Sequence, residues 1–292
     1  MQELFKENFF KAGVPVYMDW LKNNRNGLSY EFMPNKGSPL RVNTIGEEPS
    51  VFVRCDSTMG AYVAINQKWE PEKAAFFKEL TSKRFKGLDV TLVDIGANVG
   101  LFTRSCLNAR PCGVKAYCYE ADPTNFKYLE LNLNYLDRDQ ISLNNMAVLD
   151  RRGSIDFYLD ADNTGNHSLN PNSVREDERN KISIQGINAG EECHKWTSNS
   201  RPIFFKSDTQ GFDEAIISAI PSSFWDNVYG GIFEIRRIKG KNYSEEKLLC
   251  MLNKFKNKVA DRSPGQQLQT EQIIKFIDGP NDMSDLDICF WN

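Results

Sequence analysis

The spacing of hydrophobic and polar residues changes near residue 70. Before it, short apolar runs are separated by Asn, Gly and Pro, and we expect strands at 51–54 and 61–64. After it, apolar residues recur at steps of three or four, which predicts a helix over 70–85. We therefore divide the chain into a β-rich extension (1–69) and a larger domain (70–292).

Beyond residue 90, short apolar runs alternate with amphipathic stretches. We expect strands at 91–95, 114–119, 141–145, 154–159, 203–206, 231–235 and 286–291. We expect helices at 99–108 and 212–219, another after the N-cap Asp122, and a fourth after Ser244 that includes Phe255 and Val259. This alternation predicts an α/β fold with a doubly wound, mostly parallel sheet, whose ligands bind at the carboxyl ends of the strands.

Charge and composition exclude several classes of protein. The 36 Lys and Arg residues nearly balance the 39 Asp and Glu residues, so the net charge of -3 provides no field that gathers nucleic acid. We expect no membrane span, because no uncharged apolar run approaches about 18 residues. Lys6 and Lys11 argue against a secretory signal. The seven dispersed cysteines contain no C-x-x-C pair and indicate a reducing, cytoplasmic location.

The segment at 94–100 reads DIGANVG and joins an expected strand to an expected helix. Gly96 and Gly100 would let a ligand approach the backbone, and the helix N-terminus offers free N–H groups. A dinucleotide G-x-G-x-x-G loop would need glycine in place of Asn98, and no G-K-[ST] follows as in a phosphate loop. The alternative is a tight turn without a ligand.

Glu120 directly follows the next expected strand. A carboxylate at this place can accept two hydrogen bonds from vicinal ribose hydroxyls. The alternative is a solvated acid near a helix start.

Four motifs in order resemble the class I S-adenosylmethionine-dependent methyltransferases, and more narrowly the FkbM family. They are the 94–100 loop, Glu120 with Pro123, the NMAV segment at 145–148 and the KSDTQGFD segment at 206–213. The resemblance covers about residues 70–292. Gln210 and Asp213 stand where the family usually has Glu, which removes a carboxylate at 210.

The resemblance implies a Rossmann-like class I methyltransferase domain that binds S-adenosyl-L-methionine. The methionine portion would lie over 96–100, the ribose on Glu120 and the adenine beside 145–147, with Met146 as an apolar face. The implied cofactor-binding residues are Asp94, Gly96, Ala97, Asn98, Gly100, Phe102, Glu120, Ala121, Asn145, Met146, Ala147 and Asp208.

Methyl transfer is an in-line displacement, so an acceptor hydroxyl must be aligned and must lose its proton. Asp208 is the first candidate for the base, and Glu234 is a second acid at the same edge of the sheet. Lys206 could lower the pKa of the acceptor hydroxyl or pair with Asp208. His167, in a segment similar to the family's G-x-x-S-L, is either a base or an exposed loop residue. A metal is not demanded: His167, Asp208 and Glu234 could form a cation site, but no closely spaced ligand pair supports one, and we expect none.

The family resemblance, and no single residue, implies an O-methyltransferase that acts on a hydroxyl of a sugar or glycoconjugate. Alternatives are O-methylation of a polyketide or other small natural product, and a cofactor-binding module without turnover. A nicotinamide dehydrogenase is disfavoured by Asn98. The NPNS segment at 170–173 lacks the second proline and the aromatic residue of N-P-P-[YF], so methylation of nucleic acid is disfavoured as well.

Overall fold

The computed structural model describes most of the chain beyond residue 58. The described residues are 30–31, 39–42, 51–54, 58–160, 167–169, 171, 179–237, 243–260, 266–280, 282 and 284–292. They belong to two compact units, one ending at Trp69 and one beginning at Glu70. Lys6, Lys11 and all of the NPNS segment except Pro171 lie outside the described residues.

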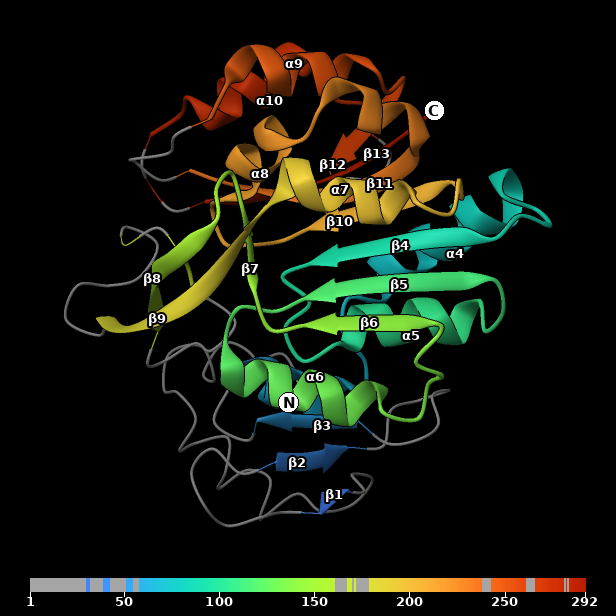
Figure 1. Cartoon of the computed structure of the whole chain (residues 1–292), viewed down its shortest axis with the longest axis vertical. Helices are drawn as coiled ribbons and strands as arrows, with labels where there is room; N and C mark the ends of the chain where they lie inside the picture. Colours follow the sequence, from blue (N-terminus) through green and yellow to red (C-terminus); the bar gives the residue numbers. More distant parts are fainter. Residues whose placement is uncertain are drawn as a thin grey trace. The chain divides into compact units, whose positions relative to one another are not determined.

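The smaller unit contains a three-stranded antiparallel sheet and a helix (Figure 1). Its elements are β1 (Tyr30–Glu31), β2 (Pro39–Val42), β3 (Val51–Arg54) and α3 (Thr58–Asn66). The strand predicted at 61–64 is wrong, because α3 occupies these positions. Met59 and Val63, one helical turn apart, are both buried and lie on one face of this helix.

A seven-stranded sheet forms the centre of the larger unit (Figure 1). In sheet order its strands are β12 (Asn257–Ala260), β13 (Asp285–Trp291), β11 (Val228–Arg236), β10 (Ile203–Ser207), β4 (Val90–Ile95), β5 (Val114–Tyr119) and β6 (Ile141–Asn144). The strands β11, β10, β4, β5 and β6 are parallel, and β13 is antiparallel to β11 and β12. When the five parallel strands are numbered by their order in the chain, they lie in the sheet in the order 3-2-1-4-5, which is the Rossmann order. The predicted fold class is confirmed.

Helices cover both faces of this sheet. The helices are α4 (Pro71–Arg84), α5 (Leu101–Ala109), α6 (Pro123–Leu133), α7 (Ala189–Thr197), α8 (Asp213–Ala219), the 3-10 helix η3 (Ser222–Asn227), α9 (Glu245–Asn253) and α10 (Thr270–Ile277). Side chains of α4, α5 and α6 share one hydrophobic core, and those of α7 to α10 share another. Two cores on one sheet are the signature of double winding. Within the described ranges, no helix has the length and apolar character needed to cross a membrane.

A second, three-stranded sheet follows β6 in the chain. It consists of β7 (Ala147–Leu149), β9 (Arg179–Asn188) and β8 (Gly153–Asp160), in that order. The ribbon predicted at 154–159 is therefore confirmed as β8, but its partner β9 and the helix α7 were not predicted. Figure 1 shows this ribbon on the side toward which the arrows of β4, β5 and β6 point.

The helix predicted after Ser244 is shorter than expected. Ser244 is its N-cap, but α9 ends at Asn253, and Val259 lies on β12. The Lys258 ammonium donates to the carbonyls of Leu252 and Phe255, which satisfies acceptors that the helix end leaves open. The helical spacing of apolar residues continues beyond the end of α9, because Phe255 and Val259 are buried in the two hydrophobic cores of the sheet although neither belongs to the helix.

A methyl group at Gly231 should destabilise the larger unit. An added Cβ would lie 2.0 Å from the carbonyl oxygen of Phe205 on β10, so β10 and β11 would have to separate. We expect Gly231→Ala to lower the unfolding free energy by about 1–3 kcal/mol, as overpacking does. Urea unfolding measures the change, and Ser223→Ala on the exposed side of η3 is the control. Equal midpoints for the two variants would contradict the prediction.

Candidate active site

The loop at 96–100 turns the chain from β4 into α5. The backbone N–H groups of Gly96 and Ala97 donate to the carbonyl of Tyr119 at the end of β5. Gly96 and Gly100 have φ of 73° and 84°. A Cβ at Gly96 would lie 1.9 Å from the carbonyl oxygen of Asp208, and one at Gly100 would lie 2.6 Å from a methyl of Leu129. The packing of this loop against Asp208 and α6 and its positive φ angles thus account for both glycines without a ligand.

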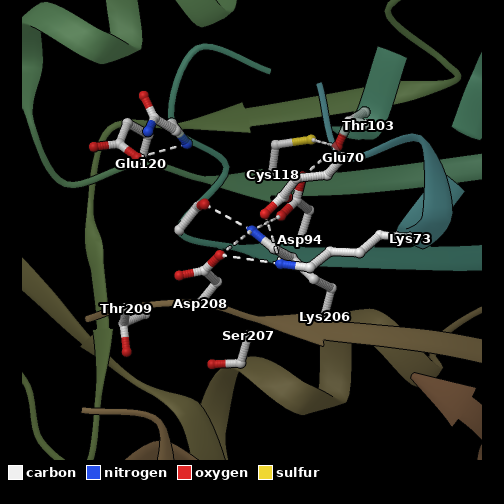
Figure 2. A network of polar contacts seen from close by, with 12 residues as sticks. Glu70, Lys73, Asp94, Thr103, Cys118, Glu120, Lys206, Ser207, Asp208 and Thr209 are labelled. Atoms are coloured by element: carbon white, nitrogen blue, oxygen red, sulfur yellow. Dashed lines mark hydrogen bonds and ion pairs between the residues drawn. The ribbon is translucent and has the colours of Figure 1, made fainter. Parts of the chain in front are cut away.

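Glu120, directly after β5, contacts this loop through its side chain (Figure 2). Its Oε2 accepts the backbone N–H of Asn98 at 2.8 Å, and its Oε1 accepts that of Asp122 at 2.9 Å. Burial raises the pKa of Glu120 to about 7, although the two backbone hydrogen bonds and the Lys206 charge oppose the shift. Each carboxylate oxygen has a second lone pair. Glu120 can therefore accept two further hydrogen bonds, as a vicinal diol would donate.

An apolar side chain lies exposed just after β6. Met146 is 36% exposed, whereas the next residue, Ala147, is buried. Asn145 donates its side-chain amide to the carbonyls of Glu120, at 2.9 Å, and Ala121, at 3.4 Å. These bonds hold the 145–146 turn beside Glu120. The turn that carries the partly exposed Met146 thus follows directly on a residue bonded to the Glu120 backbone.

Asp94, Phe102 and Lys206 lie beneath the loop. Asp94 is fully buried, and its carboxylate accepts the Thr103 hydroxyl at 2.6 Å. The Lys206 ammonium lies 3.0 Å from Asp94 and donates to the carbonyl of Gly96 at 2.8 Å. It also lies 5.8 Å from the centre of the buried Phe102 ring. In this arrangement the three side chains support the loop from within the protein.

Asp208 follows β10 and is the most exposed acid next to Lys206. Its backbone N–H donates to the carbonyl of Ile95, and its side chain is 22% exposed. Its Oδ2 lies 4.0 Å from the ammonium groups of both Lys206 and Lys73. Burial disfavours the charged form, but Lys206, Lys73, the hydrogen bond from Gln210 and the charge of Arg236 act against it, and the pKa of Asp208 is lowered. Asp208 is thus held as a carboxylate.

Gln210 joins Asp208 to Glu234. Its side-chain amide donates to Asp208 Oδ1 at 2.9 Å and to Glu234 Oε1 at 3.2 Å. Glu234 is 5% exposed, and burial together with the nearby charge of Asp208 raises its pKa well above the usual range, although Arg236 opposes the shift. The Gln210 amide therefore bonds two acids whose pKa values are shifted in opposite directions, one after β10 and one near the end of β11.

Asp213 fixes the loop that contains Gln210. Its carboxylate accepts the Ser207 hydroxyl and the backbone N–H of Thr209. It is fully buried, and burial raises its pKa to about 7. The aspartate that replaces the family's glutamate therefore contacts its own loop.

His167 is not an exposed loop residue. Its side chain is 7% exposed, and Nε2 lies 3.4 Å from Asp122, the N-cap of α6. The adjacent Ser168 donates its hydroxyl to the carbonyl of Gln210 at 2.8 Å. Residues 167 and 168 thus contact the carboxyl ends of both β5 and β10, with the glycine loop of β4 between these strands in the sheet.

Three charged residues next to Asp208, namely Glu70, Lys73 and Asp287, were not predicted from the sequence. The Lys73 side chain is 3% exposed, with its ammonium 2.8 Å from Glu70 and 3.1 Å from Asp287. Burial raises the pKa of Asp287 to about 6 against the pull of Lys73. A signal for Lys73 was present, because it lies four residues before Phe77 on the buried face of α4. Among the described residues, no group of three or more His, Cys, Asp or Glu is arranged to hold a metal ion.

No protein-family model matches the chain, and no curated protein matches it in sequence. It is similar to the solved structure of a precorrin-6y C5,15-methyltransferase from Geobacter metallireducens, with 12% identity over 75% of this chain and 87% of that chain and a TM-score of 0.32. It is also similar to that of a putative rRNA-methylase from Clostridium thermocellum, with 11% identity over 77% of this chain and 95% of that chain and a TM-score of 0.36. A third is a SAM-dependent methyltransferase from Leishmania major (8%, 76% and 72%, TM-score 0.32). At these identities the likeness concerns the fold alone, which we assign from the strand order. The chain has a Rossmann-like fold.

The buried Glu120 should make stability depend on pH. Its pKa is about 7 in the folded protein against an ordinary 4.5, so the folded state keeps a proton that the unfolded state releases. Its contribution is therefore complete below about pH 4.5 and is lost as the pH rises to about 7. We expect Glu120→Gln to gain stability relative to the unchanged protein between pH 4.5 and pH 8, by up to about 3 kcal/mol. Urea unfolding at both pH values measures this gain, and Glu130→Gln on exposed α6 is the control. A gain that is the same at both pH values would contradict the assignment.

Proposed function

We propose that this chain is an S-adenosylmethionine-dependent methyltransferase that methylates a hydroxyl of a sugar or glycoconjugate. The observation that supports it most is the arrangement around Glu120. A carboxylate with two unused acceptor positions lies at the end of β5, bonded to the glycine loop and adjacent to the exposed Met146. A diol and an aromatic base on one ligand match these two features.

The residues present fit this cofactor. Glu120 would accept the ribose hydroxyls, Met146 would contact the adenine face, and the loop at 96–100 would lie against the methionine portion. When bound, S-adenosylmethionine supplies a methyl group on a positively charged sulfur. Asp94, Phe102 and Lys206 would contribute indirectly, because they hold the loop in place from below.

Asp208 would orient the acceptor hydroxyl and accept its proton. A carboxylate with a lowered pKa is a weak base towards a free hydroxyl. However, the hydroxyl oxygen becomes strongly acidic as its new bond to carbon forms, so a weak base suffices at that moment. Gln210 fixes the Asp208 carboxylate, which supports precise alignment. Glu234 and His167 remain the alternative proton acceptors.

The sugar acceptor is supported by the motif resemblance and by the chemistry of this edge. Partly exposed carboxylates of Glu70, Asp208 and Asp287 offer hydrogen-bond acceptors, as a polyhydroxylated acceptor needs. The negative charge of Asp208 would repel a phosphate group, so a nucleic-acid acceptor is disfavoured. The dispersed cysteines support a cytoplasmic location.

Cofactor binding should depend on Glu120. Hydrogen bonds to a charged group contribute about 1.5–3 kcal/mol each, so Glu120→Ala should weaken binding of S-adenosylmethionine at least about tenfold. Isothermal titration calorimetry measures the affinity, with Glu130→Ala as the matched control and NAD as the competing ligand. Unchanged affinity in folded Glu120→Ala would refute the ribose site, and preference for NAD would refute the proposed activity.

Turnover should depend on the charge of Asp208. Asp208→Asn keeps the shape of the side chain and removes its charge, so kcat should fall about 10²- to 10⁴-fold while cofactor affinity changes much less. The measurement is mass gain on a panel of hydroxylated glycans, with phenolic small molecules as a second panel. A parallel loss of affinity and turnover would make Asp208 a cofactor ligand. If His167→Ala abolishes turnover while Asp208→Asn stays active, His167 is the base.

A further inference from the structure

Helix α4 brings a buried cation to the carboxyl end of the sheet. Lys73 lies in its first turn, and its ammonium is surrounded by Glu70, Asp287 and Asp208 at 2.8, 3.1 and 4.0 Å (the first and last in Figure 2). Glu70 precedes the helix in a left-handed conformation, and its backbone carbonyl accepts the N–H of Lys73. Three carboxyl groups and the first turn of α4 thus surround this one ammonium.

We propose that Lys73 is a positioning residue that fixes the charge and the place of the Asp208 carboxylate. The proposal rests on the proposed function, in which Asp208 meets the acceptor. Lys206 lies equally far from Asp208, at 4.0 Å, but it is bound more closely to the fully buried Asp94 and to the carbonyl of Gly96. Lys73 is the second ammonium at this distance, and it reaches Asp208 from a different element, α4.

Lys206 of β10, Lys73 of α4 and Arg236 of β11 lower the pKa of Asp208 by their charge. The acids that interact with Asp208 are Glu70, which precedes α4, Asp213 of α8, Glu234 of β11 and Asp287 of β13, while Asp94 of β4 pairs with Lys206. Acids outnumber cations in this set, so the carboxyls compete for a limited positive charge. Burial raises the pKa of Glu70, Glu234 and Asp287, whereas the two lysines lower that of Asp208.

A purely structural role is the competing explanation. Lys73 also connects α4 to Asp287 on β13, and this ion pair alone could account for its burial. The two roles differ in what they predict for Asp208. A structural connection does not change the protonation of Asp208, whereas a charge 4.0 Å away does.

The test is a titration of the Asp208 carboxyl carbon by NMR in the full chain, between pH 3.5 and pH 7, assigned with Asp208→Asn. Asp208 of the unchanged protein should titrate below the ordinary range of an aspartate. In Lys73→Met its midpoint should move up by about one unit or more, a tenfold change in its acid dissociation constant. Lys73→Arg should restore the original behaviour, and Lys78→Met on the exposed side of α4 should leave it unchanged.

Asp287→Asn separates the two roles. It breaks the pair with Lys73 but keeps the lysine charge, and Asp287 is already neutral at the pH where Asp208 titrates. We expect its Asp208 midpoint to stay where it is in the unchanged protein. An Asp208 midpoint that does not move up in folded Lys73→Met would overturn the proposal, and so would equal shifts in Lys73→Met and Asp287→Asn. Should Lys73→Met not fold, Lys73→Gln gives the same test, because its amide can still donate to Glu70 and Asp287.

The link to catalysis has its own readout. With an acceptor that shows mass gain, the acidic limb of kcat/KM against pH should move up in Lys73→Met as far as the Asp208 midpoint does. A fixed limb with a shifted midpoint would overturn the catalytic part of the proposal. The titration uses neither cofactor nor acceptor, and the proposed function is judged by calorimetry of the unchanged protein, so the two can fail separately.

Discussion

The buried ion pair of Asp94 and Lys206 is the interaction on which the rest of the site depends. Both side chains are almost fully enclosed, and such a pair is tolerated only when further hydrogen bonds satisfy both partners. Thr103 donates to the carboxylate, and the ammonium donates to the carbonyl of Gly96. The pair therefore ties the end of β10 to the loop after β4, and the close contact of Gly96 with Asp208 follows from it.

This tie also decides where the charge lies at the edge of the sheet. Lys206 lies closer to Asp94 than to Asp208, and Lys73 of α4 provides a second ammonium at 4.0 Å from Asp208. At Glu234 and Asp287, burial outweighs the nearby cations and raises the pKa. The edge thus combines one carboxyl whose pKa is lowered with others whose pKa is raised.

Sequence patterns predicted the parallel sheet and its motif-bearing turns because these depend on local signals, such as the N-cap Asp122 and the glycines after β4. They failed at β9, whose alternation is largely polar, and at α3, which is short and apolar throughout. The association of Lys73 with Asp287 was out of reach for a different reason. These residues lie near opposite ends of the sequence of the larger unit. Only the antiparallel pairing of β13 with β11 brings Asp287 opposite Glu234 at the edge where Lys73 lies.

Motif residues at this site serve the fold and the proposed ligand together, so a motif alone cannot separate the two. Gly96 is required by the Asp208 backbone and Gly100 by Leu129, whether or not a cofactor is bound. Glu120 likewise satisfies two backbone N–H groups of its own chain. What these contacts leave unused is the remaining acceptor capacity of the Glu120 carboxylate, because each of its oxygens has a second lone pair. A ligand test on Glu120 therefore separates the two roles better than one on either glycine, since the glycines are required by packing alone.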